Sequence, residues 1–173
     1  MTIELIKAHL REVPDFPTEG ILFKDITPIL ENPQLFKETI QIFKERLEEF
    51  TPEVIVGIES RGFIFAAPLA VEMGIPFVLA RKPGKLPSHK ISVEYSLEYG
   101  SDSLEIHKDS IENGQKVAIV DDLLATGGTS EAAVKLVKSL GGNVVSVVFL
   151  VELISLKGRE RISPINLISL LKE

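Results

Sequence analysis

A short loop of small and hydroxyl-bearing residues could bind a phosphate group. It follows an apolar strand-forming run at 117–120, and an amphipathic helix is expected to begin at Ser130. The loop therefore lies where the free N–H groups and the positive dipole end of a helix favour an anion. Its two glycines allow close approach of the backbone, and its two threonines add hydroxyl donors. The loop consists of Ala125, Thr126, Gly127, Gly128 and Thr129.

Two adjacent carboxylates, Asp121 and Asp122, stand immediately before this loop. The loop lacks both the Gly-Lys-Ser/Thr ending of a Walker motif and a GxGxxG pattern. Acids beside a phosphate loop are suited to accept hydrogen bonds from the 2- and 3-hydroxyls of a ribose. Two adjacent Asp residues alone would more often be turn or cap residues. The whole string from 117 to 129 favours the ligand-binding interpretation.

A second junction of the same kind is predicted at 56–62, where a strand would end at Ile58 and a helix begin near Gly62. In a parallel sheet its loop would lie beside the first, at the edge where ligands bind. Arg61 is placed there to meet an anion, although an isolated arginine is more often a surface charge. The basic segment 81–87 carries three cations and suits a pyrophosphate, with a solvated basic turn as the alternative.

The elements that would position these residues alternate between strand and helix. Such alternation predicts a mainly parallel α/β sheet flanked by helices. Apolar periodicity predicts helices at 3–12, 34–50, 62–73 and 130–140. Buried apolar runs predict strands at 54–58, 77–80, 117–120, 144–151 and 165–171. The last strand is expected to pair near the N-terminal segment, and residues 13–33 are expected to be irregular.

Residues 91–110 interrupt this alternation. Polar and apolar residues alternate on both sides of Gly100-Ser101-Asp102, which predicts a hairpin with its turn there. A hairpin just ahead of the phosphate strand could close over the site as a flexible lid.

Composition narrows the class of protein. The 173 residues are 45% hydrophobic and 25% charged, with a formal charge of −6 and no cysteine. One soluble domain is expected, without disulfides or thiolate chemistry. No Lys/Arg cluster marks a nucleic-acid-binding face, so nucleic acid is disfavoured as a partner. No signal peptide or membrane span is visible. We therefore expect a cytoplasmic protein.

The string 117–129 closely resembles the ribose-phosphate signature of the type I phosphoribosyltransferases. This family transfers phosphoribosyl from 5-phosphoribosyl 1-pyrophosphate (PRPP) to a nitrogen base. The resemblance implies the type I phosphoribosyltransferase fold, with the 5-phosphate on 125–129 and the ribose on Asp121 and Asp122. It also implies Mg²⁺ as cofactor, held mainly by PRPP, with no direct protein metal ligands.

The same resemblance gives roles to the two other loops. Ser60, Arg61, Arg81 and Lys85 would bind pyrophosphate. The family often has a cis peptide in the first loop, here Glu59–Ser60. The basic loop lies at a dimer interface in the family, which implies a homodimer in which Arg81 reaches the neighbouring subunit's site.

Four further segments resemble those family members that act on adenine. They are 16–28, the basic loop at 81–87, 95–100 and 151–159, and they follow one another along the chain in the same order as in the family. Phe23 and Leu153 could sandwich a purine, while backbone groups around Leu22 and Lys24 could read its amino edge. Either apolar residue alone would more often be ordinary core. Glu98, on the lid, is the acid–base candidate at the purine imidazole edge.

The resemblance of these segments implies a purine-salvage transferase that would make AMP and pyrophosphate from adenine and PRPP through an oxocarbenium-like transition state. We expect a single domain, 1–173, with a hood at about 1–33 plus the segment after 151. The core would span about 34–151 and the lid about 91–110. One alternative is a sister enzyme that takes hypoxanthine, guanine or xanthine. The other is a regulatory protein that senses PRPP or a nucleotide, for which the chain leaves little room for a DNA-binding module.

Overall fold

The computed structural model describes residues 3–97 and 100–173, and it divides the chain into two compact units. The first unit is Met1–Phe43 and the second is Lys44–Glu173. Each unit is described by itself below. The prediction of one domain, with a hood formed from both ends of the chain, stays a prediction.

The first unit contains a small β-hairpin that the sequence did not reveal. Its elements are α1 (Ile3–Ala8), β1 (Arg11–Pro14), β2 (Leu22–Asp25), α2 (Thr27–Leu30) and the start of α3 (Pro33–Glu48). The predicted helix 3–12 therefore ends at Ala8, and the predicted irregular region 13–33 contains most of the hairpin. The strands are antiparallel, and an Arg11–Asp25 ion pair joins one register pair across them. These cross-strand contacts override the helical periodicity of residues 3–12.

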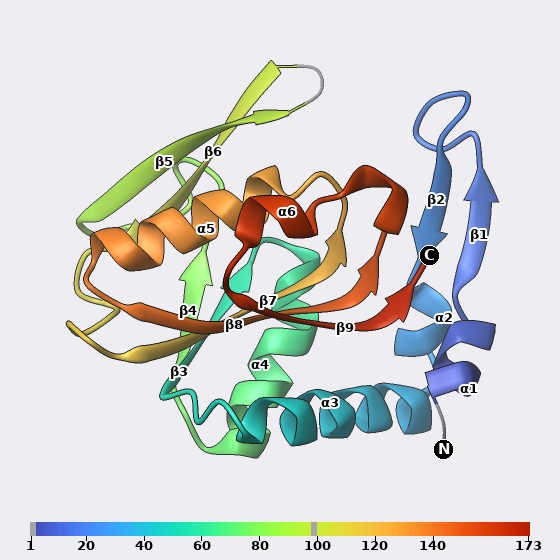
Figure 1. Cartoon of the computed structure of the whole chain (residues 1–173), viewed down its shortest axis with the longest axis horizontal. Coiled ribbons are helices and arrows are strands. Elements are labelled where there is room, and N and C mark those ends of the chain that lie inside the picture. The colour runs from blue at the N-terminus through green and yellow to red at the C-terminus, as the bar shows by residue number, and fades with distance from the viewer. Residues whose placement is uncertain (1–2, 98–99) are drawn as a thin grey trace. The chain divides into compact units, whose positions relative to one another are not determined.

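The second unit is built on a five-stranded parallel sheet, as predicted (Figure 1). The strands are β3 (Val54–Ile58), β4 (Phe77–Ala80), β7 (Lys116–Leu124), β8 (Asn143–Glu152) and β9 (Asn166–Lys172). Two of them, β3 and β4, have the predicted bounds. Their order in the sheet is β4-β3-β7-β8-β9. The last strand pairs with β8 at one edge of the sheet, and its expected position near the N-terminal segment stays a prediction.

This order creates a topological switch point between β3 and β7. The chain leaves β3 towards β4 on one side and leaves β7 towards β8 on the other. Ligands of open α/β sheets bind outside the carboxyl ends of the strands at such a point. The two junctions identified in the sequence follow these two strands, so the topology brings them to one edge of the sheet.

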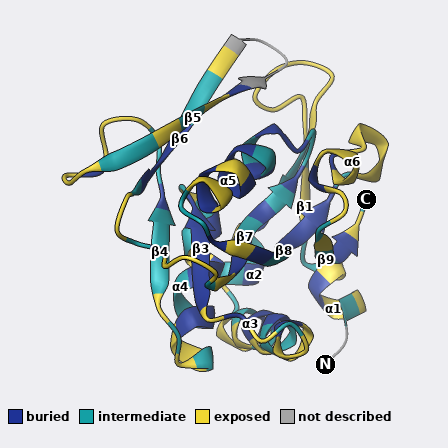
Figure 2. Cartoon of the chain, turned by 60° about the vertical axis from the view of Figure 1, so that its left-hand side comes forward, coloured by how far each residue is buried: buried dark blue, intermediate teal, exposed yellow. Residues whose placement is uncertain are grey.

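Helices cover both faces of this sheet (Figure 1). One is α4 (Arg61–Met73), and the other is α5 (Gly128–Ser139) on the opposite face. Two glycines permit α4 to lie against the strands: a Cβ at Gly57 would meet the Ala66 Cβ at 2.8 Å, and one at Gly62 would meet the Val120 carbonyl oxygen at 2.7 Å. The sheet is consequently buried at its centre, where β3 and β8 are dark blue in Figure 2.

The predicted hairpin is present. Its strands are β5 (Lys90–Leu97) and β6 (Gly100–His107), which pair from Lys90↔His107 to Leu97↔Gly100. The segment Gly100-Ser101-Asp102, predicted as the turn, instead begins β6. Glu98 and Tyr99 stand between the two strands in the sequence and lie outside the described residues, so the role of Glu98 stays a prediction.

The segment after β8 consists of the 3-10 turn η1 (Ile154–Leu156) and α6 (Arg159–Ile162), which lead into β9. Among the helices described, none is long and apolar enough to cross a membrane.

Candidate active site

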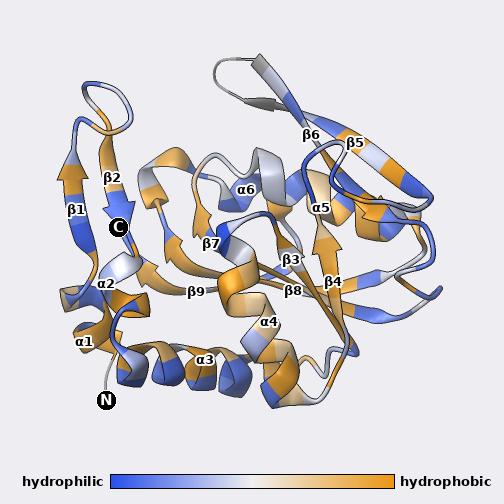
Figure 3. Ribbon diagram, turned by 180° about the vertical axis from the view of Figure 1, so that it is seen from behind, coloured by the Kyte–Doolittle hydropathy of each residue, from blue (hydrophilic) through white to orange (hydrophobic). Residues whose placement is uncertain are grey.

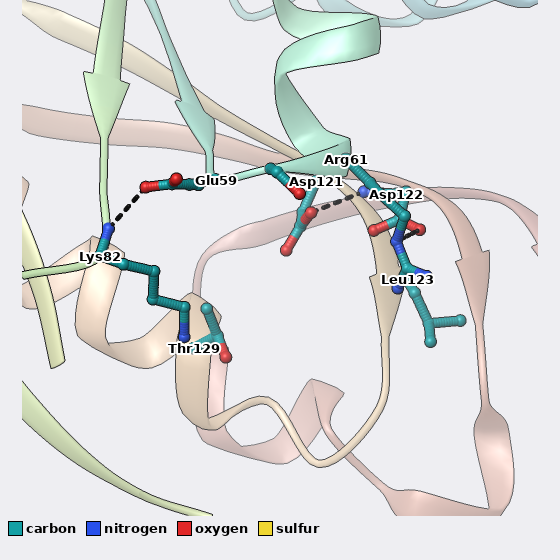
Figure 4. Close-up of a pocket in the computed structure, with 8 residues that line it drawn as sticks. Glu59, Arg61, Lys82, Asp121, Asp122, Leu123 and Thr129 are labelled. Atoms are coloured by element: carbon teal, nitrogen blue, oxygen red, sulfur yellow. Dashed lines mark hydrogen bonds and ion pairs between the residues drawn. The ribbon is translucent and has the colours of Figure 1, made fainter. Parts of the chain in front are cut away.

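A pocket of about 400 Å³ opens at the switch point between β3 and β7 (Figure 4). Five of the residues predicted from the sequence line it, together with three that were not assigned a role. The predicted ones are Ser60, Arg61, Asp121, Asp122 and Thr129. The additional ones are Glu59, Lys82 and Leu123. The pocket therefore combines both strand–helix junctions in one polar site.

Asp121 and Asp122 lie inside β7, because this strand runs to Leu124 rather than ending at Val120 as predicted. Pairing with β8 extends the strand through the acids, with Asp121 opposite Phe149. Asp122 is only 4% exposed and forms an ion pair with the Arg61 Nε at 2.8 Å. The acids are thus held rigidly at the mouth of the site rather than displayed on a loop.

The environment of the two acids favours their neutral forms. Burial, reinforced by the charge of Asp122, raises the pKa of Asp121 well above its ordinary value. Burial also raises the pKa of Asp122, although the Arg61 guanidinium opposes this. A cluster of partly desolvated carboxylates is costly for the free protein and is typical of groups retained for a ligand.

Glu59 organises the other side of the pocket, a role that its sequence position did not suggest. Its carboxylate accepts hydrogen bonds from the Arg81 guanidinium at 3.0 and 3.2 Å and from the Lys82 backbone N–H at 2.8 Å. The hydrogen bond from Arg81 is the main reason that the pKa of Glu59 is lowered. The Glu59–Ser60 peptide is cis, as the family resemblance implied.

The basic loop after β4 is attached to the hairpin. Arg81 and Glu105 exchange backbone hydrogen bonds of 2.9 and 2.7 Å, and the Glu105 carboxylate accepts the Gly84 N–H at 3.1 Å. Arg81 and Lys85, both predicted as pyrophosphate ligands, do not line the pocket in this single chain. Lys85 is exposed, and its carbonyl accepts a hydrogen bond from Arg81.

The phosphate loop leads directly into α5, which begins at Gly128 rather than at the predicted Ser130. Gly127 is the N-cap residue in the left-handed region, with φ of 83°. A Cβ here would lie 2.5 Å from the Gly158 carbonyl oxygen. In turn, a Cβ at Gly158 would lie 2.2 Å from the Ala125 carbonyl oxygen. The two backbones therefore touch, and the segment before α6 supports the loop.

We expect Gly127→Ala to lower the free energy of unfolding by more than the strain of its left-handed backbone conformation alone. Gly114→Ala is the matched control, because Gly114 has φ of 80° but open space at its Cβ position. The control should cost about 1–2 kcal/mol for the left-handed conformation. Gly127→Ala should lose about a further 1–3 kcal/mol from overpacking against Gly158. Denaturant unfolding measures this difference, and equal losses in the two variants would show that the contact has no energetic role.

A buried acid anchors the supporting segment. Glu152, at the end of β8, is 3% exposed and accepts hydrogen bonds from Arg159 at 2.9 and 2.6 Å and from the Ser169 hydroxyl at 2.6 Å. Burial alone would raise the pKa of Glu152, but the hydrogen bonds from Arg159 and Ser169 lower it. Nothing in the sequence pairs these residues. A local signal that could have indicated a close backbone approach is Gly158, the residue before Arg159.

The predicted adenine residues belong to different units. Leu22, Phe23 and Lys24 form most of β2 in the first unit, where the Phe16 and Phe23 rings meet edge to face at 5.1 Å. Leu153 belongs to the second unit, and its N–H donates to the Leu124 carbonyl at 2.9 Å, next to the phosphate loop. Their arrangement around a base stays a prediction, as does the role of Glu98.

The described residues contain no group of three or more His, Asp or Glu side chains that could hold a metal ion. Mg²⁺ commonly binds through one or two carboxylates together with substrate phosphates and water. The pocket is open and polar, with Asp121 and Asp122 beside the space for a substrate, which fits a Mg²⁺ ion held mainly by the phosphate and hydroxyl oxygens of that substrate.

Comparison with known proteins identifies relatives along the whole chain. The phosphoribosyl transferase domain model matches residues 25–172. An adenine phosphoribosyltransferase of Thermoanaerobacter pseudethanolicus is 55% identical over 172 residues, which cover 99% of both chains. The crystal structure of the protein from this organism superimposes with a TM-score of 0.97 and 54% identity, covering 99% of this chain and 100% of that one.

Two more distant structures carry ligands. The Saccharomyces cerevisiae enzyme, complexed with an imino-altritol bisphosphate and adenine, has 45% identity and a TM-score of 0.94, with 97% of each chain covered. The Trypanosoma brucei enzyme, in complex with AMP, pyrophosphate and ribose-5-phosphate, has 29% identity and a TM-score of 0.90. The match covers 99% of this chain and 79% of that one.

Proposed function

Because the chain belongs to the phosphoribosyltransferase family and, within it, to the adenine phosphoribosyltransferases, we propose that it converts adenine and PRPP into AMP and pyrophosphate. This proposal is supported most directly by the pocket at the switch point. Arg61 and Lys82 line it together with the acid pair Asp121 and Asp122 and with Thr129 in the first turn of α5. Such a site offers anion-binding groups for two phosphate ends and hydroxyl-binding groups between them. The bisphosphate named for the yeast relative, and the AMP, pyrophosphate and ribose-5-phosphate named for the trypanosome relative, all carry phosphate groups that such a site could bind.

The pocket suggests how the work is divided among the residues. The N–H groups of 125–129 bind the 5-phosphate, and Asp121 and Asp122 bind the ribose hydroxyls. Ser60 and Arg61 hold the pyrophosphate at the opposite junction, with Arg81 and Lys85 from the basic loop. Leu22, Phe23, Lys24 and Leu153 hold adenine, and Glu98 handles the proton at its imidazole edge.

The reaction would depend on Mg²⁺. A bound Mg²⁺ would neutralise the charge on the leaving pyrophosphate. As the C1–pyrophosphate bond lengthens, positive charge builds on the ribose ring, and the rigid acids near the ribose stabilise that oxocarbenium-like state. Holding both ends of PRPP aligns C1 with the incoming nitrogen.

One assay tests this function. The purified protein is incubated with PRPP, Mg²⁺ and adenine, hypoxanthine, guanine or xanthine in turn, and nucleotide formation is measured. We expect adenine to be strongly preferred, because backbone groups around Leu22 and Lys24 would read its amino edge, and the Lys24 ammonium is already paired with Glu12. Comparable kcat/KM for a 6-oxopurine would favour a sister enzyme, and binding of PRPP without turnover would favour a sensor.

We also propose that the protein acts as a homodimer in solution. The outer side of α4 and the edge strand β4 present an apolar surface: Val71 is 80% exposed and Ile64 36%, while Phe63 meets Phe77 edge to face. Figure 3 shows α4 largely in the hydrophobic colours. An exposed apolar face next to the basic loop fits a second copy of the chain that receives Arg81.

Mixing two inactive variants tests whether Arg81 serves the neighbouring site. In a heterodimer of Arg81→Ala and Glu98→Ala subunits, one of the two sites would have both groups intact. Random exchange should then restore about a quarter of the wild-type activity, because half the dimers are mixed and each has one complete site. If Arg81 acts within its own chain, where it now bonds to Glu59, no mixed dimer has a complete site and activity stays absent.

A further inference from the structure

Lys82 is held at both ends. Its backbone N–H donates to Glu59, which also lines the pocket, while its ammonium donates to Asp102 and to the Tyr95 hydroxyl at 2.9 Å. The two ammonium partners form a register pair across β5 and β6. Figure 4 shows the Lys82 backbone nitrogen beside Glu59 and its side chain extending towards Thr129, and the ammonium partners of Lys82 lie on the hairpin.

The ammonium retains capacity for a ligand. An ammonium has three N–H donors, and Asp102 and Tyr95 accept two of them. Lys82 lines the pocket, whereas its two partners do not. The cation is therefore oriented from outside the pocket by groups that do not compete for the space of a substrate.

Asp102 is suited to this task by its surroundings. Its second carboxylate oxygen accepts the Ser103 N–H at 2.7 Å, which fixes the carboxylate on β6. Tyr95 is 8% exposed, so its hydroxyl comes from a rigid, packed ring. The Lys82 ammonium also lies 5.5 Å from the centre of that ring. Burial works against both charges of the ion pair, but the hydrogen bonds between them raise the pKa of Lys82 and lower that of Asp102.

We propose that Asp102, assisted by Tyr95, is a positioning residue that holds the Lys82 ammonium ready to bind the pyrophosphate of PRPP. A free lysine side chain loses rotamer entropy when it is immobilised by a ligand. The hairpin incurs that loss before the substrate arrives, so binding is tighter. This inference rests on the proposed function, since it assigns the cation to the pyrophosphate end of that substrate.

The test is a double-mutant cycle read as pyrophosphate affinity. Asp102→Ala should raise the Kd of magnesium pyrophosphate, measured by calorimetry, about tenfold, which corresponds to about 1.4 kcal/mol. The KM for PRPP should rise in parallel, while the KM for adenine stays unchanged. In a Lys82→Met background, Asp102→Ala should have no further effect, because it acts only through that ammonium.

Two further variants guard against a trivial explanation. Glu94→Ala removes an exposed acid from the same hairpin and should leave the Kd unchanged. Tyr95→Phe removes only a hydroxyl and should raise the Kd more modestly. It tests the same positioning role if Asp102→Ala does not fold. An unchanged Kd in both Asp102→Ala and Tyr95→Phe, or an equal effect of Asp102→Ala in the Lys82→Met background, would overturn the proposal.

The outcome is separable from the proposed function. If the wild-type protein forms no AMP, the proposed function fails, and the calorimetric cycle still decides whether Asp102 positions Lys82. If AMP forms normally and the cycle shows no coupling, only the positioning role fails.

Discussion

Replacing Asp121 and Asp122 together by Asn is expected to abolish tight PRPP binding while the protein stays folded. Hydrogen bonds to a charged group contribute about 1.5–3 kcal/mol each, so losing the two carboxylates should weaken PRPP by a hundredfold or more. The Asn side chains keep the shape of the site but offer an amide in place of each carboxylate. Calorimetric titration with PRPP measures the loss, and Asp109→Asn, an exposed substitution of the same type, is the control.

Stability should move in the opposite direction for the single variant Asp121→Asn. The folded-state pKa of Asp121 is raised by burial and by the charge of Asp122, so its ionisation destabilises the folded protein. This penalty is absent below the unfolded pKa, grows as the pH rises towards the folded pKa, and is complete above it. The variant should therefore gain unfolding free energy relative to wild type as the pH rises from about 4 towards neutrality.

The two measurements distinguish acids that bind the substrate from acids that only cap the end of the strand. A double variant that loses stability but binds PRPP normally would show that the acids only terminate β7 and stabilise the junction. Loss of PRPP affinity, combined with a gain in stability for Asp121→Asn, would show that the site retains a costly carboxylate for its substrate.

The sheet was predictable because its signals are local. Val54–Ile58 and Phe77–Ala80 are short apolar runs bounded by polar or turn residues, and both strands have the predicted limits. The end of β7 was not predictable, because the backbone pairing of Asp121 with Phe149 depends on a strand about thirty residues away in the sequence. Local propensity assigns two adjacent acids to a loop, and the neighbouring strand reverses that assignment.

The same distinction applies to the site. A glycine-rich loop and an arginine at a strand end are visible from residue types alone, and the pocket contains Arg61 and Thr129 as expected. The contacts of Glu59 with Arg81 and of Lys82 with Asp102 join segments about twenty residues apart. No periodicity encodes such pairs, so the organising roles of Glu59 and Lys82 emerge only from the fold.

Glu98→Gln is expected to lower the rate of the chemical step about 10²–10⁴-fold, the usual cost of losing a general acid–base group. The residue connects β5 and β6 in the sequence, and its role follows from the resemblance of 95–100 to the adenine-using members of the family. Gln keeps the size and hydrogen-bonding capacity of the side chain but removes its charge and its ability to accept a proton. If Glu98 acts only in the transition state, kcat and kcat/KM should fall together while the KM for adenine stays nearly constant.

The measurement must isolate chemistry from product release, because release limits turnover in many enzymes with mobile loops. Single-turnover rates with excess enzyme therefore provide the readout, and Glu94→Gln on the same hairpin is the matched control. A rise in the KM for adenine at unchanged kcat would make Glu98 a ground-state binding group. A near wild-type single-turnover rate would remove Glu98 from proton transfer, and catalysis would then depend on the alignment of PRPP by the two junctions and on neutralisation of the leaving pyrophosphate.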